Sequence, residues 1–395
     1  MKSYDINLDE LPHEERDAVV ELRQRMKGQM EPELYDEISM FHRFLKARNF
    51  NLNASEEMMR KHLIWRKLNQ VDTILTDFTP SEVVEKYLPL SRMGFDKEGS
   101  PILYSQFGNL DSRGLIKSVR RVDVMKVIVK SLEIDVQEMK QESMKRGKRI
   151  DKWIYIFNFE NFSLATATHK ATLEILGSLV TMYEANYPER LKVGIFINAS
   201  LYFTLAWSVI KPFLSGPTVK KVKIFGKEGW QEELLKIIDA DTLPKFLGGN
   251  RTDPDGNPLC KTVINHGGQV PESYYIYKDS KSLSQLPGVR KLSISRMSKT
   301  DLPLHVIEPG STIEWEFETK SKDIGFALLY QEYKGANIKE LIPNQRIDTM
   351  VSAETGTYLC DKAGIYTIQF DNSYSWMHHK EVYCKAVVIP RVKKS

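Results

Sequence analysis

Residues 187–226 read YPERLKVGIFINASLYFTLAWSVIKPFLSGPTVKKVKIFG, and this stretch decides the fold. It begins with a nearly continuous apolar run over 191–199, which is interrupted by Lys192 and Asn198. Runs rich in Ile, Val and Phe are typical of a central parallel strand that is covered on both faces. A second strand is predicted over 219–225. The stretch therefore predicts a strand–helix–strand unit.

The segment between the two strands, residues 201–214, has the length and pattern of a helix. Thr204, Ser208 and Lys211 form one narrow polar stripe, and Pro212 lies near the end. The other faces carry Leu201, Tyr202, Phe203, Leu205, Trp207, Val209, Ile210 and Phe213. Such a helix is either a buried core helix or one with a face on the fold and another on lipid or membrane.

Charged and hydroxyl side chains flank this apolar helix on both sides. They are Glu189, Arg190, Thr218, Lys220, Lys221 and Lys223. Charges around an apolar helix suit a ligand with a polar head and an apolar body, so they favour the lipid interpretation. Lys220 and Lys223 are expected to be solvated or to attract anionic membranes.

Several ordered motifs resemble those of the CRAL-TRIO lipid-transfer family. They are YPER at 187–190, IN at 197–198, KPFL at 211–214, TVKK at 218–221 and LPKFLGG at 243–249. The text FHRFLKARNFNLNASEEMM at 41–59, followed by WRK, resembles the helical leader of these domains. The family includes phosphatidylinositol and phosphatidylcholine transfer proteins and carriers of tocopherol and retinaldehyde.

The resemblance implies an apolar lipid pocket behind a gate helix. The implied gate and pocket residues are Leu201, Phe203, Leu205, Trp207, Ile210 and Phe213. Motif matching implies a headgroup set of Arg48, Glu189, Arg190, Thr218 and Lys221. Asn49 stands where phosphoinositide-binding relatives often have Lys, which leaves the lipid class open. The alternative is that Glu189, Arg190 and Lys221 form a fixed salt-bridge network.

The chain as a whole is expected to be multidomain, with a helical leader over residues 1–75. Residues 76–250 are expected to form an α/β CRAL-TRIO domain with a mostly parallel sheet. Strand patterns at 102–107 and 153–159 flank a predicted single helix over 113–145. Alternating strands and helices argue for right-handed crossovers.

The C-terminal third changes character. Residues 251–289 are polar and rich in turn signals, which predicts a connector. Over 290–392, alternating patterns such as Ile313, Trp315 and Phe317 between glutamates predict an all-β sandwich. The ending at 370–383 resembles the GOLD domain, which is taken as a protein-interaction module. The alternative is a β-sandwich without a separable role.

Composition and the absence of targeting signals indicate the kind of protein and its location in the cell. The chain has 395 residues, 42% hydrophobic and 27% charged, with a net charge of +4 that does not by itself imply nucleic acid. Neither a secretory signal nor a membrane-length apolar run is read, and three cysteines fit a reducing compartment. We therefore expect a cytoplasmic protein that associates transiently with intracellular membranes.

No catalytic motif is found. The P-loop, the G-x-G-x-x-G, the H-E-x-x-H and the G-x-S-x-G patterns are all absent from the sequence. An enzyme, a metal site, a cofactor and a nucleic-acid partner are therefore not expected.

The leading hypothesis is a carrier that exchanges a phospholipid, of the phosphatidylinositol or phosphatidylcholine class, at membranes. The alternatives are a carrier of a neutral isoprenoid of the tocopherol or squalene class, and a lipid-sensing adaptor in vesicle traffic. The adaptor would bind a protein partner through its GOLD domain.

Overall fold

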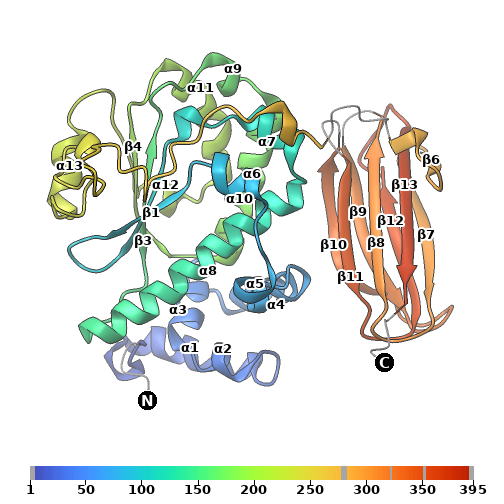
Figure 1. Ribbon diagram of the computed structural model, residues 1–395. Helices are drawn as coiled ribbons and strands as arrows, with labels where there is room; N and C mark the ends of the chain where they lie inside the picture. Colours follow the sequence, from blue (N-terminus) through green and yellow to red (C-terminus); the bar gives the residue numbers. More distant parts are fainter. Residues whose placement is uncertain (1–4, 277–282, 321–322, 350–352, 391–395) are drawn as a thin grey trace, which may run out of the picture. The chain divides into compact units, whose positions relative to one another are not determined.

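The computed structural model describes residues 5–276, 283–320, 323–349 and 353–390. The chain forms two compact units (Figure 1). The first comprises Met1–Leu115 and Met125–Tyr274, and the second comprises Ile116–Val124 and Tyr275–Ser395.

The first unit begins with a small helical bundle. Its helices are α1 (His13–Met26), α2 (Pro32–Tyr35), α3 (Ile38–Lys46) and α4 (Leu52–Leu68), followed by α5 (Ile74–Asp77) and α6 (Glu82–Tyr87). The side chain of Asn51 caps α4 by accepting a hydrogen bond from the Ala54 amide at 3.0 Å. Val19, Leu22 and Phe41 are fully buried in the bundle core. The predicted helical leader is therefore confirmed as a helical region.

A five-stranded sheet forms the centre of this unit. Its strands are β1 (Ser91–Phe95), β2 (Pro101–Ser105), β3 (Trp153–Asn158), β4 (Leu191–Ile197) and β5 (Val222–Ile224), in the order β1-β2-β3-β4-β5. β1 runs antiparallel to β2, and the other pairs are parallel. The predicted mostly parallel sheet is confirmed.

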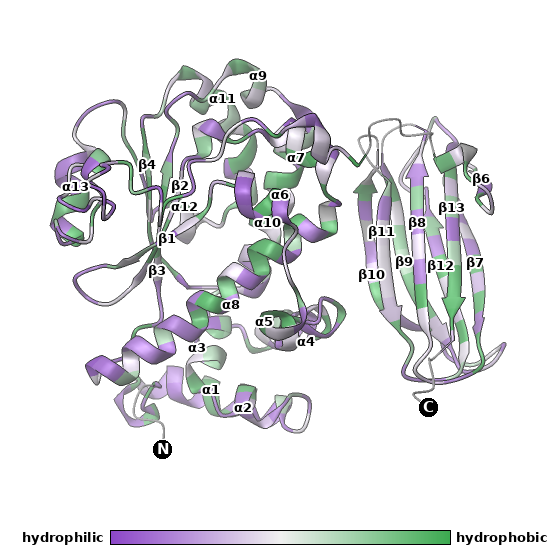
Figure 2. Cartoon of the chain, in the orientation of Figure 1, coloured by the Kyte–Doolittle hydropathy of each residue, from purple (hydrophilic) through white to green (hydrophobic). Residues whose placement is uncertain are grey.

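The connecting helices lie on one face of the sheet and α13 lies on the other (Figure 1). The connections contain α7 (Ser112–Ser118), α8 (Arg121–Arg146), α9 (Leu164–Ala167), α10 (Lys170–Asn186), α11 (Leu201–Ile210), the 3-10 turn η4 (Lys211–Phe213) and α12 (Gly216–Val219). Because spatial order follows chain order, right-handed crossovers place these helices on the same face. Figure 2 shows hydrophobic and hydrophilic residues alternating along α8, as expected for a helix with one solvated face.

The predicted single helix over 113–145 is wrong. Residues Val119 and Arg120 separate α7 from α8. The guanidinium of Arg120 donates to the Asp123 carboxylate at 2.8 Å, and the Asp123 amide donates to the Arg120 carbonyl at 3.0 Å. This local arrangement starts a new helix without a Pro or Gly signal.

The face of the sheet toward α13 (Trp230–Ile237) is closely packed. Ile154, Ile156, Ile195 and Ile197 are at most 1% exposed and belong to one cluster with Trp230. Cys260 and Ile264 complete this cluster, so the start of the predicted connector packs into the core of the first unit.

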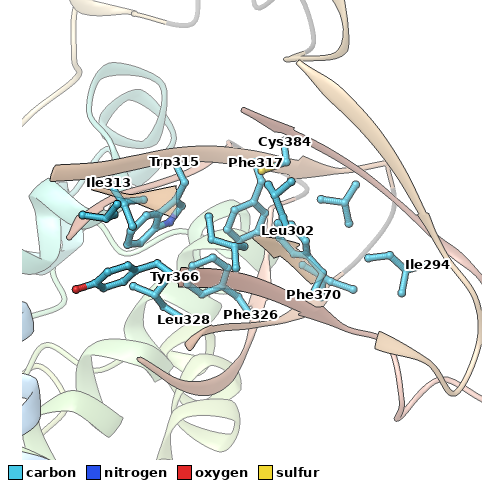
Figure 3. Packing of buried hydrophobic residues seen from close by; sticks show 14 of the residues in the cluster. Ile294, Leu302, Ile313, Trp315, Phe317, Phe326, Leu328, Tyr366, Phe370 and Cys384 are labelled. Atoms are coloured by element: carbon cyan, nitrogen blue, oxygen red, sulfur yellow. The ribbon is translucent and has the colours of Figure 1, made fainter. Parts of the chain in front are cut away.

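The second unit contains an antiparallel β-sandwich. Its strands are β6 (Arg290–Ile294), β7 (Lys299–Val306), β8 (Thr312–Thr319), β9 (Asp323–Gln331), β10 (Lys339–Asp348), β11 (Glu354–Leu359), β12 (Gly364–Asp371) and β13 (Lys380–Ile389). They form two sheets, β10-β9-β12-β7 and β11-β8-β13-β6. Figure 3 shows Phe317, Phe326 and Phe370 meeting in the core between the sheets. The predicted all-β region is therefore confirmed.

Candidate functional site

The sheet face toward the crossover helices keeps accessible apolar surface. Tyr155 and Phe157 on β3 and Phe196 on β4 are half-buried, although both strands lie inside the sheet and helices cover this face. They alternate with the fully buried isoleucines of the opposite face. Leu173 and Leu179 on α10 are half-buried as well. The helices therefore do not close against the sheet here as α13 does on the other side.

Two tyrosines, Tyr155 and Tyr183, lie close together on this surface. Tyr155 and Tyr183 lie with ring centroids 6.4 Å apart, and the indole of Trp153 donates to the Tyr183 hydroxyl at 3.0 Å. Burial raises the pKa of both phenols well above the ordinary value, and for Tyr155 the nearby Asp135 raises it further. Both side chains lie largely inside the protein and yet retain accessible area.

One face of α11 packs on an aromatic cluster at the edge of this surface. Phe203 is 4% exposed, with its ring centroid 4.6 Å from that of Phe159. Trp207 is half-buried with its ring centroid 5.5 Å from that of Phe196. Ile210, near the end of the helix, is also half-buried. The structure therefore brings two of the predicted gate residues, Phe203 and Trp207, together over the sheet.

The other face of α11 presents apolar side chains to solvent. Leu201 is 84% exposed, Leu205 49% and Val209 45%, and Phe213, in the 3-10 turn that follows the helix, is 47% exposed. Of the predicted gate residues, Leu201 and Leu205 therefore lie on the outer face of the helix, away from the aromatic cluster, and Phe213 lies beyond the end of the helix. Contiguous exposed apolar side chains mark an interaction surface more often than isolated ones do.

A hydrogen-bonded network at the ends of the strands fixes the start of α11. The side-chain amide of Asn198 donates to Asn158 at 2.8 Å, and Asn158 donates to Gln106 at 3.0 Å and to the Tyr104 hydroxyl at 3.1 Å. Asn198 adopts φ of +55°, which turns the chain from β4 toward the helix. The sequence placed Asn198 at a break in an apolar run and in the IN motif at 197–198, but gave no sign of this network.

We call α11 and the 3-10 turn η4 together, residues 201–213, the gate segment, and its C-terminal end packs on α10. A 3-10 turn continues from α11 through Phe213, and the Phe213 ring lies over Gly177. A Cβ atom at Gly177 would lie 3.1 Å from this ring, closer than ordinary contact. Gly177 therefore permits the close approach of the gate segment to α10.

Three of the five predicted headgroup residues come together beside β5. The Lys221 ammonium lies 3.3 Å from the Glu189 carboxylate, and the Lys221 amide donates to the Thr218 carbonyl at 3.0 Å. Thr218 itself is half-buried within α12. Lys221 thus contacts Glu189 through its side chain and Thr218 through the backbone, while the Thr218 hydroxyl pairs with the Ser215 hydroxyl at 2.9 Å.

Arg190 lies in a different, buried network. Its guanidinium is 3.3 Å from Glu37 and donates to the Asp151 carbonyl at 3.1 Å. Glu37 also pairs with Arg43 at 2.8 Å and with Lys140 at 3.4 Å. Burial alone would raise the pKa of Glu37, but these three cations outweigh it and hold the pKa well below the ordinary value. Burial and the neighbouring Arg43 lower the pKa of Arg190 to about 10.

Two features explain why the five residues do not converge. Glu189 adopts φ of +60°, so Glu189 and Arg190 enter different surroundings although they are consecutive. Arg48 is exposed between α3 and α4, where its guanidinium donates to the Ala47 carbonyl at 2.9 Å. Within the described residues, no ion pair links Arg48 to the other four.

Comparison with known proteins identifies the domain that carries this site. Residues 85–249 match the model of the CRAL/TRIO domain. The chain contains a CRAL/TRIO domain. Such a domain implies binding of a lipophilic ligand, which agrees with the accessible apolar surface between the sheet and the helices of this CRAL/TRIO domain.

The chain is also similar to curated proteins over much of its length. It is 27% identical to the protein ctg-1 of Caenorhabditis elegans over 344 residues, 86% of this chain and 88% of that protein. It is 26% identical to the protein real-time of Aedes aegypti over 360 residues, 83% of this chain. This chain spans 54% of the length of real-time. The crystal structure of Sfh5 matches 67% of this chain and 96% of its own, at 14% identity and a TM-score of 0.49.

Two further findings concern the described parts of the chain. None of their helices combines the length and the apolar composition that crossing a membrane requires. They also hold no group of three or more His, Cys, Asp or Glu side chains arranged to bind a metal ion.

Proposed function

We propose that this protein carries a lipid between the central sheet and the helices α8, α10 and α11, and exchanges it at cytoplasmic membrane surfaces when α11 moves. The observation that carries the proposal is the contrast between the two sheet faces. Ile154 and Ile156 are closed off under α13, whereas Tyr155 and Phe157 of the same strand keep accessible surface.

The energetics of lipid transfer require a movable cover. A phospholipid has roughly thirty acyl methylenes, and exposing each to water costs about 0.8 kcal/mol. Moving the whole lipid through water would thus cost on the order of 24 kcal/mol. α11 suits the task because its inner face carries Phe203 and Trp207, while its outer face offers Leu201, Leu205 and Val209 to a bilayer.

A second ligand class is an uncharged lipid such as an isoprenoid. The charge distribution favours it, because Arg190 is already engaged by Glu37 and Arg48 lies apart. Lys221 is then the one cation of the predicted headgroup set beside Glu189 and Thr218. The sequence motifs of the chain also resemble those of supernatant protein factor, also called tocopherol-associated protein, and this resemblance is a further reason to propose the same ligand class.

Native mass spectrometry tests ligand capture. The full chain is incubated with liposomes containing phosphatidylcholine, phosphatidylinositol, tocopherol or squalene, and then weighed as the intact complex. We expect an adduct with the mass of one lipid. A chain that acquires none of these four ligands contradicts the proposal.

A matched pair of variants tests the role of α11. Leu205→Glu places a charge on the apolar outer face, and Thr204→Glu places the same charge at an exposed polar position of the same helix. We expect Leu205→Glu to slow transfer of labelled lipid between vesicles at least tenfold while the amount of bound lipid stays the same. Thr204→Glu is expected to transfer lipid within twofold of the natural rate. Equal rates for both variants argue against α11 as the membrane-facing cover.

Lys221 separates the two ligand classes. Lys221→Ala removes the cation beside Glu189, and Lys220→Ala removes an exposed neighbour as the control. If a phospholipid is the ligand, Lys221→Ala lowers the uptake of phosphatidylinositol and Lys220→Ala does not. Uptake that is unchanged in both variants, with tocopherol or squalene still bound, favours the neutral ligand.

For the second unit we propose a GOLD domain. The support is the antiparallel sandwich of β6–β13 together with the sequence ending at 370–383 that resembles this domain. An adaptor role in vesicle traffic then requires this unit for localisation but not for lipid uptake. Deleting residues 291–395 and measuring both properties distinguishes an adaptor from a simple carrier.

A further inference from the structure

Two turns meet at one end of the β-sandwich in the second unit. The first, residues 295–298, joins β6 to β7, and the second, residues 372–379, joins β12 to β13. We call these two segments together the Trp376 tip. The Met297 amide donates to the carbonyls of Asn372 and Ser375 at 3.1 and 3.2 Å, so the two turns form one continuous surface.

A buried asparagine holds the tip in one conformation. The side-chain amide of Asn372, which is 0% exposed, donates to the carbonyls of Ile294, Ser295 and His378 at 3.0 to 3.2 Å. Met297 adopts φ of +56°, which costs energy for a residue other than glycine. The surrounding hydrogen bonds offset this strain. The tip is therefore ordered before it meets any partner.

This ordered tip points large apolar side chains into solvent. Trp376 is 76% exposed, Met377 79% and Met297 58%. The same sandwich has a well-packed core, in which Phe317 and Phe370 are completely buried. The exposure of the three tip residues is therefore not explained by the absence of a core. Concentrated apolar exposure on rigid turns indicates a contact that the described residues of this chain do not themselves supply.

The size and charge of the tip identify the kind of partner. A tryptophan buries roughly 150–250 Å², so three side chains fall short of the roughly 800 Å² per partner of a stable protein interface. Residues 295–298 and 372–379 contain Arg296, His378 and His379 and no acidic residue, whereas the neighbouring Lys299, at the start of β7, pairs with Asp371 at 3.0 Å. Trp is favoured at the interface between water and bilayer, and cations are attracted to anionic lipid.

We propose that the Trp376 tip inserts into the interfacial region of membranes that contain anionic lipid and gives the second unit a membrane contact of its own. This proposal does not depend on lipid carriage by the first unit. It assigns Trp376, Met377 and Met297 as the inserting side chains, and Arg296 as a cation at the headgroup level.

The test uses the full chain and two kinds of vesicle, pure phosphatidylcholine and phosphatidylcholine with phosphatidylserine. Every protein compared carries Leu205→Glu, so that any contact through α11 is weakened equally. The tip variant combines Trp376→Ser with Met377→Ser. The control is Ile307→Ser, because Ile307 is 86% exposed beyond the opposite end of β7. Each protein must keep the thermal unfolding midpoint of the Leu205→Glu background chain.

We expect the tip variant to partition at least tenfold more weakly onto the anionic vesicles and the control to stay within twofold. Lipid brominated in its acyl chains is expected to quench tryptophan fluorescence less when Trp376→Phe is introduced, although five other tryptophans remain. Unchanged partitioning of the tip variant overturns the proposal. Equal partitioning onto neutral and anionic vesicles overturns the assignment of anionic lipid.

Discussion

At the scale of single residues, Glu37 balances two buried guanidinium groups. Arg43 and Arg190 are each 7% exposed and both pair with its carboxylate. Removing one partner of a buried ion pair leaves an uncompensated charge and costs roughly 3–5 kcal/mol. We expect Glu37→Gln to lower the free energy of unfolding at pH 7 by about this amount, measured by urea denaturation. Glu33→Gln, at an exposed position, is the control and is expected to change it by less than about 0.5 kcal/mol.

The pH dependence of the same pair of proteins follows from the direction of the pKa shift. The pKa of Glu37 is lowered in the folded state, so its contribution to stability is present above the ordinary glutamate pKa of about 4.3 and is lost as the pH falls below it. The difference between the natural chain and Glu37→Gln is therefore expected to shrink in acid. A difference that stays constant from pH 7 to pH 3 argues against the ion pair as its cause.

Asp135 is predicted to give the opposite pH dependence, with a stability that falls as the pH rises. It is fully buried on α8, one oxygen accepts from the Arg92 guanidinium at 3.1 Å, and the other has no partner among the described residues. Burial raises its pKa to about 7, partly offset by Arg92. Because the folded chain holds the proton more tightly than the unfolded chain, with a pKa of about 3.9, stability falls as the pH rises from about 4 to about 7.

Asp135→Asn tests this sign. The amide resembles the protonated acid and still accepts from Arg92, so we expect the variant to be more stable than the natural chain at pH 8, by on the order of 4 kcal/mol. The gain is expected to vanish toward pH 4. Urea unfolding at both pH values provides the measurement, with Asp36→Asn at an exposed site as the control. A variant that is less stable at pH 8 contradicts the prediction.

At the scale of elements, local sequence predicted the type of most elements around the site but not all of their ends. The apolar run at 191–199 became β4, and the segment 201–214 became α11 followed by a 3-10 turn. Pro212 explains the change, since it lacks the amide that an α-helix needs there. The strand predicted from Val219 begins at Val222, because Ser215 caps the short α12 by accepting from the Thr218 amide.

The contacts of the charged residues could not be predicted from the sequence, because they join residues that lie far apart in the chain. Arg190 meets Glu37 across 153 positions of sequence, and the left-handed turn at Glu189 leaves no signature in residue type. Of the five residues that the motif grouped, Lys221 does contact Glu189, 32 positions away, and its amide donates to the Thr218 carbonyl. The motif also placed Arg48 and Arg190 in the headgroup set. The positions of these two side chains depend on tertiary packing, which the motif does not describe. Their role in headgroup binding stays a prediction.

Gly177 offers a test of how α10 holds the gate segment. A side chain at this position meets the Phe213 ring, which is 47% exposed. We expect Gly177→Leu to displace Phe213 and to accelerate lipid exchange severalfold in the vesicle transfer assay. The free energy of unfolding is expected to change by less than about 1 kcal/mol. Leucine stabilises a helix by about that much over glycine, which offsets the cost of displacing the ring.

The control for Gly177 lies on the same helix. Thr181→Leu changes an exposed position of α10. It is expected to leave the exchange rate within twofold of the natural chain. Exchange that is equally fast in both variants places the effect in α10 as a whole and not in its contact with Phe213.

At the scale of the whole molecule, each compact unit has a core of its own. The first closes its sheet against α13 around Ile156 and Ile195, and the second packs aromatic residues between two antiparallel sheets. Phe326 lies at the centre of the second core, 2% exposed, with its ring centroid 5.2 Å from that of Phe317. The apolar surface around Tyr155 belongs to the first unit and Phe317 and Phe326 belong to the second, so we expect lipid capture and the stability of the sandwich to be separable.

Phe326→Ala in the full chain tests this separation. Truncating a buried phenylalanine costs roughly 3–5 kcal/mol, so we expect hydrogen exchange to accelerate across residues 312–319 and 364–371. Exchange across β3, β4 and α10 and the capture of lipid in native mass spectrometry are expected to stay unchanged. Tyr333→Ala removes an aromatic ring that is 65% exposed on the same unit and is expected to alter neither. Loss of lipid capture in Phe326→Ala alone would show that the carrier function depends on the folded sandwich and would count against the division of labour proposed for the two units.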